Sequence, residues 1–498
     1  MVNYSCESCG KEFNQKSHYD SHNKRKTPCK KQINKIELLE SKLNIIASKL
    51  ENLNQSINNP INQVVNKSIN QSINNPINQV VNNEQSINQS INNPINQVVN
   101  NEQSFTIVET FVGCGGAHLG FKNNGFKTLL VNDIDKNMID TLLLNKCVDK
   151  DKTFVGPIQK LTNEILDNRI KNNVDVLFGG IVCKGFSLAG VRNPFDTRNY
   201  LYKEQLRLVE KLRPKVSIIE NVVGIKKMVL YKKCEETATV FKTYTDLSDK
   251  NKNLNGQKSA RRKINQDYSD ILETINKNKK EMSILIKSIE SYKYNVLDDI
   301  KNKYQDLGYT FYSKLLSVDD YGGYTIRKRF IMVAVRNDIK KTYVYPTPHT
   351  TKYKLKDALD KLDLIHVNNP SNDMDNQPMK HKEKTIKRFK YIPEGKNIAD
   401  VMNTLPTELQ TSKFYSRGTS QRLDRNRLVP TLVPGHSNFP IHPLEHRSIT
   451  VREAATITGF PIDYKFVGSH TSRCMQVGNA VPVHLSDALA KSILKLLQ

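Results

Sequence analysis

Two residues in the middle of the chain, Cys183 and Glu220, have side chains and positions suited to catalysis. Cys183 follows the apolar run VDVLFGGI and lies in the segment VCKGF. A thiol on such a loop can be positioned and activated as a nucleophile, although a lone cysteine is more often a buried structural residue. Glu220 closes the apolar run of IIENVVGI. A carboxylate at that place serves either as a general acid with a raised pKa or as a cap on the next helix.

Three further polar residues lie in two other motifs. Arg327 and Arg329 alternate in YGGYTIRKRFIMVAVR, so both fall on one face of the strand that this run predicts. They either line a site or form a solvated basic edge. Asn479 follows Gly478 in MQVGNAVPVHLSDALA, which predicts a turn and then a helix. Asn479 is therefore either a binding residue or an ordinary cap.

A glycine-rich turn near residue 113 predicts a nucleoside-binding site. ETFVGCGGAHLGF is a β-rich run that ends in Gly113, Gly115 and Gly116, and such glycines allow a tight turn and close approach of a ligand. Asp133 lies twenty residues after Gly113, at the end of the next apolar run, where an acidic residue can bind ribose hydroxyls. A dinucleotide-binding motif would have glycine at position 118, which is His118 here, so no pyrophosphate cradle is expected.

Short apolar runs precede these residues and define the fold class. FTIVETF, TLLVNDID, VDVLFGGI and KVSIIENV read as strands, with helical stretches between them. Strands that alternate with helices predict an α/β fold, in which helices cover both faces of a parallel sheet. Because ligands of such sheets bind at the carboxyl ends of the strands, most of these residues are expected to meet at one edge.

Taken in order, these blocks resemble the signature motifs of the cytosine-5 DNA methyltransferase family. The resemblance spans about 105–336 and 417–498 and includes DTRNYLYKEQLRLVEKLRP, RSITVREAATITGFPIDYKF and QVGNAVP. Five or more blocks in register are far more specific than any one block. The resemblance implies a Rossmann-like, S-adenosylmethionine-dependent methyltransferase fold with a smaller target recognition domain. A restriction–modification system is one candidate source, and the finger-like start and AT-rich usage point to a virus as the other.

The resemblance also implies a role for each residue. The target cytosine is flipped out of the duplex, Cys183 attacks its carbon 6, and Glu220 protonates ring nitrogen 3. Arg329 holds the base oxygen, and Arg327 orders a loop or contacts a phosphate. The cofactor is S-adenosyl-L-methionine, and the residues expected to line its site are Phe111, Gly113, Gly115, Gly116, Asp133, Leu201 and Asn479.

Four positions depart from the family pattern. Val182 and Lys184 flank the nucleophile in place of proline and glutamine, Thr325 replaces a glutamine, and Pro157 replaces an aspartate. These changes leave two alternatives open. One is an impaired homologue that only binds DNA. The other is an RNA cytosine-5 methyltransferase, although the Cys-Phe-Thr signature associated with the transfer-RNA branch is absent.

The first 32 residues resemble a zinc finger. Cys6 and Cys9 are separated by two residues, and twelve more lead to His22. A second histidine is missing from its usual place near Lys26, so Cys29 is the expected fourth ligand. Four such ligands suit tetrahedral zinc, without which so short a segment cannot fold. The alternative is a degenerate finger that holds no metal.

Two further segments separate this finger from the α/β region. Residues 33–57 place leucine and isoleucine three and four apart, which predicts a short coiled coil and weak homo-oligomers, or else an amphipathic helix packed on its own chain. Residues 58–104 carry most of a repeat, SINNPINQVVN, which occurs three times from residue 56 and reads as an Asn/Gln-rich linker.

The rest of the chain divides into a catalytic region and a recognition region. We expect a catalytic domain over 105–339, a target recognition region over 340–445, and the C-terminal part of the catalytic domain over 446–498. Within the first, residues 226–303 form a Lys-rich insertion with helices from about Ile264 to Tyr304. A solvated insertion is favoured there over a nucleic-acid-facing arm.

The overall charge agrees with a nucleic-acid partner. The net charge of +25 favours a polyanion such as double-stranded DNA, although AT-rich codon usage accounts for some of the lysine. The eight scattered cysteines are not a disulfide framework and indicate a reducing, intracellular setting. No apolar run is long enough to cross a membrane.

Overall fold

The computed structural model describes residues 4–6, 12–13, 15–23, 104–181, 194–366, 373–411, 420–433 and 439–498. The chain divides into two compact units, residues 1–102 and 103–498. In the first unit, β1 (Tyr4–Ser5) pairs with β2 (Glu12–Phe13) in an antiparallel manner, and α1 (Lys16–Asn23) follows. The expected coiled coil at 33–57 and the linker at 58–104 lie outside the described residues.

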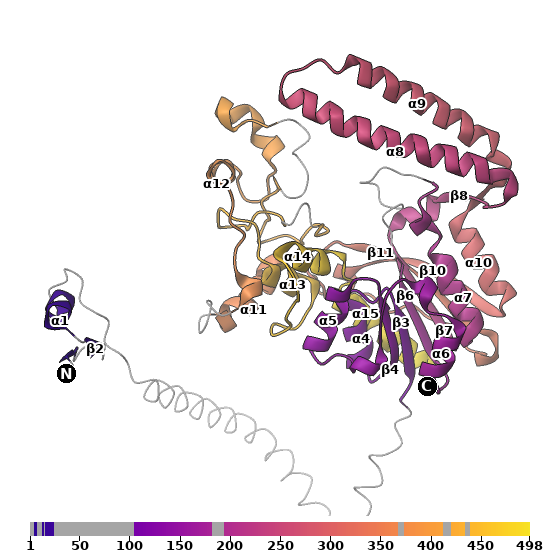
Figure 1. Ribbon diagram of the computed structural model, residues 1–498. Helices are drawn as coiled ribbons and strands as arrows, with labels where there is room; N and C mark the ends of the chain where they lie inside the picture. The colour runs from indigo at the N-terminus through magenta and orange to yellow at the C-terminus, as the bar shows by residue number, and fades with distance from the viewer. Residues whose placement is uncertain are drawn as a thin grey trace, which may run out of the picture. The chain divides into compact units, whose positions relative to one another are not determined.

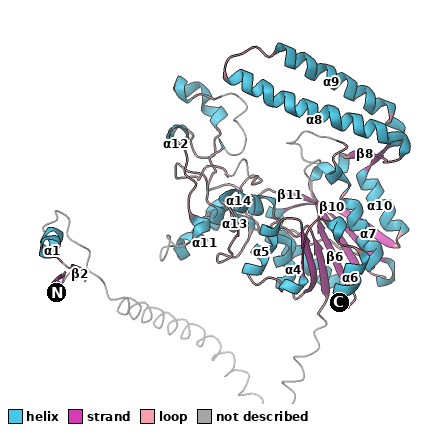
Figure 2. Ribbon diagram, in the orientation of Figure 1, coloured by secondary structure: helices cyan, strands magenta, loops and turns pink. Residues whose placement is uncertain are grey.

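The second unit is built on a seven-stranded sheet (Figures 1 and 2). The strand order is β10-β11-β7-β6-β3-β4-β5, and β11 alone runs opposite to the other six. The strands are β3 (Thr106–Thr110), β4 (Lys127–Asp133), β5 (Thr153–Val155), β6 (Val176–Gly180), β7 (Val216–Asn221), β10 (Tyr309–Ser317) and β11 (Lys328–Arg336). The chain moves outward from β3 to β5 and then returns to the other side of β3, so the strand order reverses between β3 and β6.

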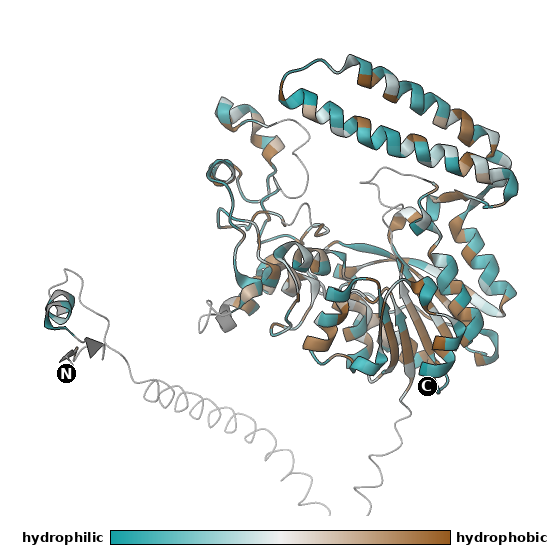
Figure 3. Ribbon diagram, in the orientation of Figure 1, coloured by the Kyte–Doolittle hydropathy of each residue, from teal (hydrophilic) through white to brown (hydrophobic). Residues whose placement is uncertain are grey.

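Two apolar cores cover the two faces of the sheet, because successive strand residues point to opposite sides. Ile107 packs into one core with α4 (Gly116–Asn123) and α15 (Val483–Leu497). Its neighbour Val108 packs into the other core with α6 (Asn163–Arg169), α7 (Tyr202–Leu212) and α10 (Val296–Asp306). Figure 3 shows the apolar colouring concentrated in these strands. This layered arrangement confirms the expected α/β fold.

A third core joins the C-terminal helices to the sheet region. It contains residues of α5 (Lys136–Leu144), α11 (Leu355–His366), α13 (Val451–Thr458) and α14 (His470–Asn479). A smaller core lies within the expected recognition region and includes Phe389 of α12 (Glu383–Lys390), Ile398 and Ile441. The expected recognition region thus has a core of its own, while α11 packs against α13 of the catalytic region.

The insertion is a helical hairpin that starts earlier than the sequence predicted. After the short strand β8 (Val229–Tyr231), α8 (Glu235–Lys263) and α9 (Ser269–Ser288) run antiparallel, and β9 (Lys293–Asn295) pairs with β8. The expected start near Ile264 was wrong because α8 carries almost no apolar stripe; of its apolar side chains only Leu247 is buried. Its pairing with α9 supplies the missing stabilisation, including a 2.9 Å hydrogen bond from the Asn278 amide to Asn251 Oδ1.

No helix among the described residues is both long and apolar enough to span a bilayer.

Candidate active site

The carboxyl ends of β6 and β7 and the start of β11 meet at one edge of the sheet. Gly180, the last residue of β6, pairs with Glu220, and Glu220 also pairs with Ile331 of β11. The Asn221 side-chain amide donates to the carbonyl of Ile181 over 3.3 Å, which ties the segment after β6 to the end of β7. Cys183 follows Ile181 by two residues and lies outside the described residues.

Glu220 and Arg329 form a nearly buried ion pair at this edge. Arg329 Nε lies 2.5 Å from Glu220 Oε1, and each residue is 8% exposed. Arg329 Nη1 also donates to the carbonyl of Lys328 over 2.9 Å, while the Lys328 side chain itself points to solvent. A carboxylate and a guanidinium are thus fixed side by side, where they could act together on one polar substrate.

Arg327 immediately precedes β11 and, like Arg329, is buried, but it contacts a different part of the protein. Its Nη1 donates to the carbonyl of Gly478 over 2.8 Å and to that of Leu432 over 3.2 Å. It is 5% exposed. These bonds join the start of β11 to the end of α14 and to Leu432 of the expected recognition region. The expected alternation of Arg327 and Arg329 onto one buried face is therefore present, but only Arg329 contacts Glu220.

The turn after β3 forms the other half of this edge. Phe111 has φ 52°, Gly113 58° and Gly115 95°. Such a conformation costs a bulky residue like Phe111 about 1–3 kcal/mol, and strain of this kind clusters where a ligand is held. The backbone N–H of Gly113 donates to Asp133 Oδ2 over 2.9 Å, so the turn is tied to the end of β4.

The three glycines of this turn face different surroundings. A Cβ added to Gly113 would meet nothing within 4 Å, whereas one at Gly115 would lie 2.5 Å from the Leu142 side chain. A Cβ at Gly116 would lie 2.1 Å from the Val481 carbonyl. Gly113 therefore leaves open space for a ligand, while Gly115 and Gly116 allow close packing of the turn and of α4.

Asp133 and its neighbour have the chemistry that a nucleoside needs. Burial raises the pKa of the Asp133 carboxyl, while hydrogen bonds from the N–H groups of Asp135 and Gly113 act to lower it. Each of its oxygens accepts one of these backbone bonds and has a further lone pair for a ribose hydroxyl. Ile134 beside it is 68% exposed, which offers an apolar surface to a purine ring. The open space at Gly113, the carboxylate and this surface together fit S-adenosylmethionine.

The two remaining residues assigned to the cofactor lie at helix ends. Leu201 caps α7 after η3 (Thr197–Tyr200) and packs partly against the core below the sheet edge. Asn479 is exposed at the last position of α14, not in a turn before a helix as expected. The helix ends there because Pro482 two residues beyond Ala480 cannot continue it, and α15 then begins at Val483.

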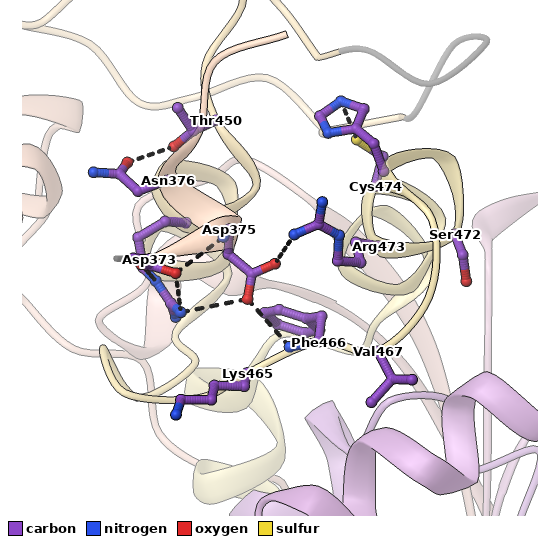
Figure 4. A network of polar contacts seen from close by, with 12 residues as sticks. Asp373, Asp375, Asn376, Thr450, Lys465, Phe466, Val467, Ser472, Arg473 and Cys474 are labelled. Carbon is purple, nitrogen blue, oxygen red and sulfur yellow. Dashed lines mark hydrogen bonds and ion pairs between the residues drawn. The ribbon is translucent and has the colours of Figure 1, made fainter. Parts of the chain in front are cut away.

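A buried network that the sequence did not reveal supports the helices next to this site (Figure 4). Asp375, in η8 (Met374–Asn376), accepts hydrogen bonds from Arg473 Nη1 over 2.8 Å and from the Phe466 N–H over 3.1 Å. Arg452 of α13 donates to Asp373 over 2.7 Å and reaches Asp375 at 3.5 Å. No local pattern signals this network, because Asp375 precedes both arginines by more than seventy residues.

The N-terminal unit contains only part of the expected metal site within the described residues. Cys6 and His22 are both buried, at 4% and 7% exposure. Cys9 and Cys29 lie outside the described residues. Among the residues that the structure does describe, no three histidine, cysteine or acidic side chains are grouped closely enough to hold a metal ion.

The fold and this edge define an S-adenosylmethionine-dependent methyltransferase of the Rossmann-like type. The family described as C-5 cytosine-specific DNA methylase matches residues 105–248 and 287–495. The chain belongs to this family and is a DNA (cytosine-5)-methyltransferase.

Curated relatives and a solved structure agree with this assignment. The chain is 30% identical over 404 residues to the type II methyltransferase M.Eco47II of Escherichia coli, covering 79% of each chain. It is 28% identical over 407 residues to M.PspPI of a Psychrobacter species, covering 79% of this chain and 80% of the relative. A structure from an E. coli prophage, described as that of a DNA modification methyltransferase, matches with a TM-score of 0.52 at 22% identity. It covers 79% of this chain and 99% of that one, and it supports the fold alone.

Proposed function

We propose that the chain methylates carbon 5 of a flipped cytosine in double-stranded DNA, with Cys183 as the nucleophile. The observation that carries this proposal is the Glu220–Arg329 pair, 2.5 Å apart, at the strand ends next to the segment that leads to Cys183. A buried carboxylate beside a guanidinium matches the ring nitrogen and the carbonyl oxygen that neighbour each other on cytosine. A base inside a stacked duplex cannot reach such an edge, so the cytosine must leave the helix.

The residues would act in a fixed order. The Cys183 thiolate bonds to carbon 6 while Glu220 donates a proton to nitrogen 3, which makes the ring electrophilic and leaves an enamine. Arg329 holds the neighbouring base oxygen, and Arg327 holds the start of β11 against α14. S-adenosylmethionine supplies the methyl group when bound. A base then removes the proton from carbon 5, the Cys183–carbon 6 bond breaks and releases the thiolate, and nitrogen 3 returns its proton to Glu220.

The cofactor would lie over the strand ends of β3 and β4. Asp133 would accept from the ribose hydroxyls, Ile134 would pack on the adenine, and the turn from Phe111 to Gly115 would pass beneath the methionine part. Leu201 and Asn479 would border it. Three strand spacings separate β4 from β7, roughly 14 Å, which leaves room for a nucleoside and a flipped base between Asp133 and Glu220.

Bisulfite sequencing of DNA from cells that express the protein tests the activity and finds the target sequence. Protected cytosines are expected at a defined sequence with the intact chain and none with Cys183→Ala. If DNA from cells with the intact protein converts completely, while cytosines in transfer RNA are protected, the RNA methyltransferase alternative holds instead.

We further propose that Cys6, Cys9, His22 and Cys29 bind one zinc ion. The β-β-α order of the N-terminal unit and the burial of Cys6 and His22 support this proposal. The full chain, purified without added metal, should release about one zinc equivalent when a thiol reagent is added, as expected for a thiolate-rich site. Cys29→Ser should release less. A chain that contains no zinc and takes none up would show that the finger is degenerate.

Residues 33–57 are proposed to associate as a weak coiled coil. About three heptads are near the lower limit for a self-sufficient coil, so association should depend on concentration. The full chain should sediment as a dimer or larger species at high concentration, and Leu43→Asp with Leu50→Asp should give a monomer. A full chain that is monomeric at every concentration would refute this assembly.

A further inference from the structure

The charges of the α8–α9 hairpin are separated along its length. In the distal half, residues 250–280, nine lysines and arginines face three acidic residues. In the base, residues 235–249 and 281–290, two basic residues face six acidic ones. The exposed face of a helix that has no binding partner usually carries charges of both signs, which form pairs between residues i and i+4. The hairpin instead has a basic arm, defined here as residues 250–280, on an acidic base.

Most of the charges on the basic arm have no acidic partner among the residues that the structure describes. Arg261 pairs with Asp270 at 2.7 Å. Within the part of the chain that the structure describes, the other eight basic residues of the arm form no ion pair, and nearly all of their side chains are exposed. Lys252, Arg262 and Lys263 are among the exposed ones. Unpaired exposed charges of one sign repel each other, so the arm is electrostatically suited to a polyanion.

The hairpin leaves the catalytic region from the edge that contains the active site. Glu220 and Asn221 end β7, η4 (Val223–Lys227) follows directly, and β8 leads into α8. In Figure 1 the hairpin extends from β8 across the upper side of the molecule, on which α12 of the recognition region also lies. The 29 residues of α8 span about 43 Å, more than one turn of duplex DNA at about 34 Å.

Aromatic packing fixes the base of the hairpin. The ring of Phe195 lies 4.1 Å from that of Phe241 and 4.7 Å from that of Tyr244, both on α8. The Tyr200 hydroxyl donates to the carbonyl of Tyr231 in β8 over 3.0 Å. The arm is therefore anchored to the segment between Cys183 and Glu220 and cannot swing freely about a flexible linker.

We propose that the basic arm binds the phosphate backbone of duplex DNA beside the target site. This inference rests on the proposed function, because it takes the DNA to be bound at the Glu220 edge. The match to the C-5 cytosine-specific DNA methylase family is interrupted over 249–286, so this contact belongs to this chain's own insertion. Lysine and arginine contacts of this kind hold the duplex without reading its sequence.

Salt-dependent DNA binding by the full chain tests the arm. The variant replaces Lys252, Arg262 and Lys263 with glutamine, which keeps a high helix propensity. The slope of log K against log salt is negative, and it should become shallower by about 0.9 for every phosphate that the variant no longer neutralises. The affinity for DNA should fall about 10- to 100-fold near physiological salt. The matched control replaces the exposed lysines Lys127, Lys171 and Lys341, which lie near the opposite edge of the sheet. The control should bind as the unmodified chain does.

Duplex length gives a second, independent readout. On a duplex of about 30 base pairs the arm variant should bind more weakly than the intact chain, and on one of about 10 base pairs, too short to reach the arm, the two should bind alike. Equal slopes and equal affinities on the long duplex, with an unchanged circular dichroism spectrum, would overturn the proposal. Methylation at low salt should persist in the arm variant. If neither protein methylates DNA, the proposed function fails, while the affinity comparison still decides whether the arm contacts the duplex.

Discussion

The sheet edge and the α8–α9 hairpin use charge in opposite ways. At the sheet edge, Glu220, Arg327 and Arg329 are each less than 9% exposed, and hydrogen bonds or ion pairs fix their positions. On the basic arm, residues such as Lys252 and Lys263 are exposed and form no ion pair with any described residue. A buried charge needs a specific partner because desolvation is costly. An exposed charge is hydrated, so it needs no partner within the chain and is available to bind another molecule.

This difference teaches where a substitution should act. Changing a buried charge at the sheet edge removes one side of a fixed contact and should alter rate or stability. Changing an exposed charge on the arm leaves the fold intact and should alter only the binding of a polyanion. The contributions of the two regions can therefore be distinguished by measuring turnover, stability and DNA affinity on the same set of variants.

Glu220→Gln should have the largest effect on turnover. The amide keeps the shape of the carboxyl but cannot donate its proton to the base, so methyl transfer should slow by about two to four orders of magnitude. DNA affinity should change little. The matched control is Glu210→Gln on α7, whose side chain is 60% exposed. Single-turnover transfer of a labelled methyl group measures both. A rate close to that of the control would make Glu220 structural.

His118→Ala should have the largest effect on stability. His118 Nδ1 lies 2.5 Å from Glu109 Oε1, and both side chains are at most 1% exposed. Removing one partner leaves a buried charge uncompensated and should reduce the free energy of unfolding by about 3–5 kcal/mol. Glu109→Met combined with His118→Leu removes both charges and should be much less destabilising. Equal destabilisation of the two variants would show that the loss of stability does not come from the unpaired buried charge. Denaturant unfolding measures both.

The same pair predicts a pH dependence of stability. Burial acts to lower the pKa of His118, but the charge and hydrogen bond of Glu109 outweigh it and leave the pKa above the ordinary 6.5. The contribution of the pair is therefore fully present below pH 6.5 and disappears as the pH rises through the raised value. This alkaline destabilisation should be absent from the double variant.

Asp133→Ala should weaken the cofactor site without unfolding it. Loss of hydrogen bonds to a charged acceptor costs about 1.5–3 kcal/mol, which is roughly 10- to 100-fold in the affinity for S-adenosylmethionine. Asp140→Ala on α5, which pairs with Lys136 on its own helix, is the control. Titration calorimetry on the full chain reports the affinity. If both variants bind alike, the ribose contact lies elsewhere.

Two glycines should give effects of opposite sign, and that of Gly256→Ala should be the smallest of all. A Cβ at Gly256 in α8 would meet nothing within 4 Å, so Gly256→Ala should stabilise the hairpin by up to about 1 kcal/mol. Gly116→Ala should instead destabilise the chain, because its Cβ would lie 2.1 Å from the Val481 carbonyl. Thermal unfolding that shifts both variants in the same direction would contradict the packing described here.

The sequence predicted the sheet edge well because its signals are local. Glu220, Asp133 and the two arginines each border an apolar run, and a run of that kind identifies both the strand and its end. The start of α8 was predicted wrongly, since a helix held by an antiparallel partner can form with few apolar residues of its own. The Asp375–Arg452–Arg473 network could not be predicted either, because its members are brought together only by the packing of η8 against α13 and α14.

Covalent trapping tests the central assignment most directly. Duplex DNA with 5-fluorocytosine at the target position blocks the last step, because fluorine cannot leave carbon 5 as a proton does. The intact chain with S-adenosylmethionine should form an adduct that survives denaturing electrophoresis, and Cys183→Ala should form none. An adduct that persists in Cys183→Ala, or none from an intact chain that methylates ordinary cytosine, would contradict the assignment of Cys183 as the nucleophile.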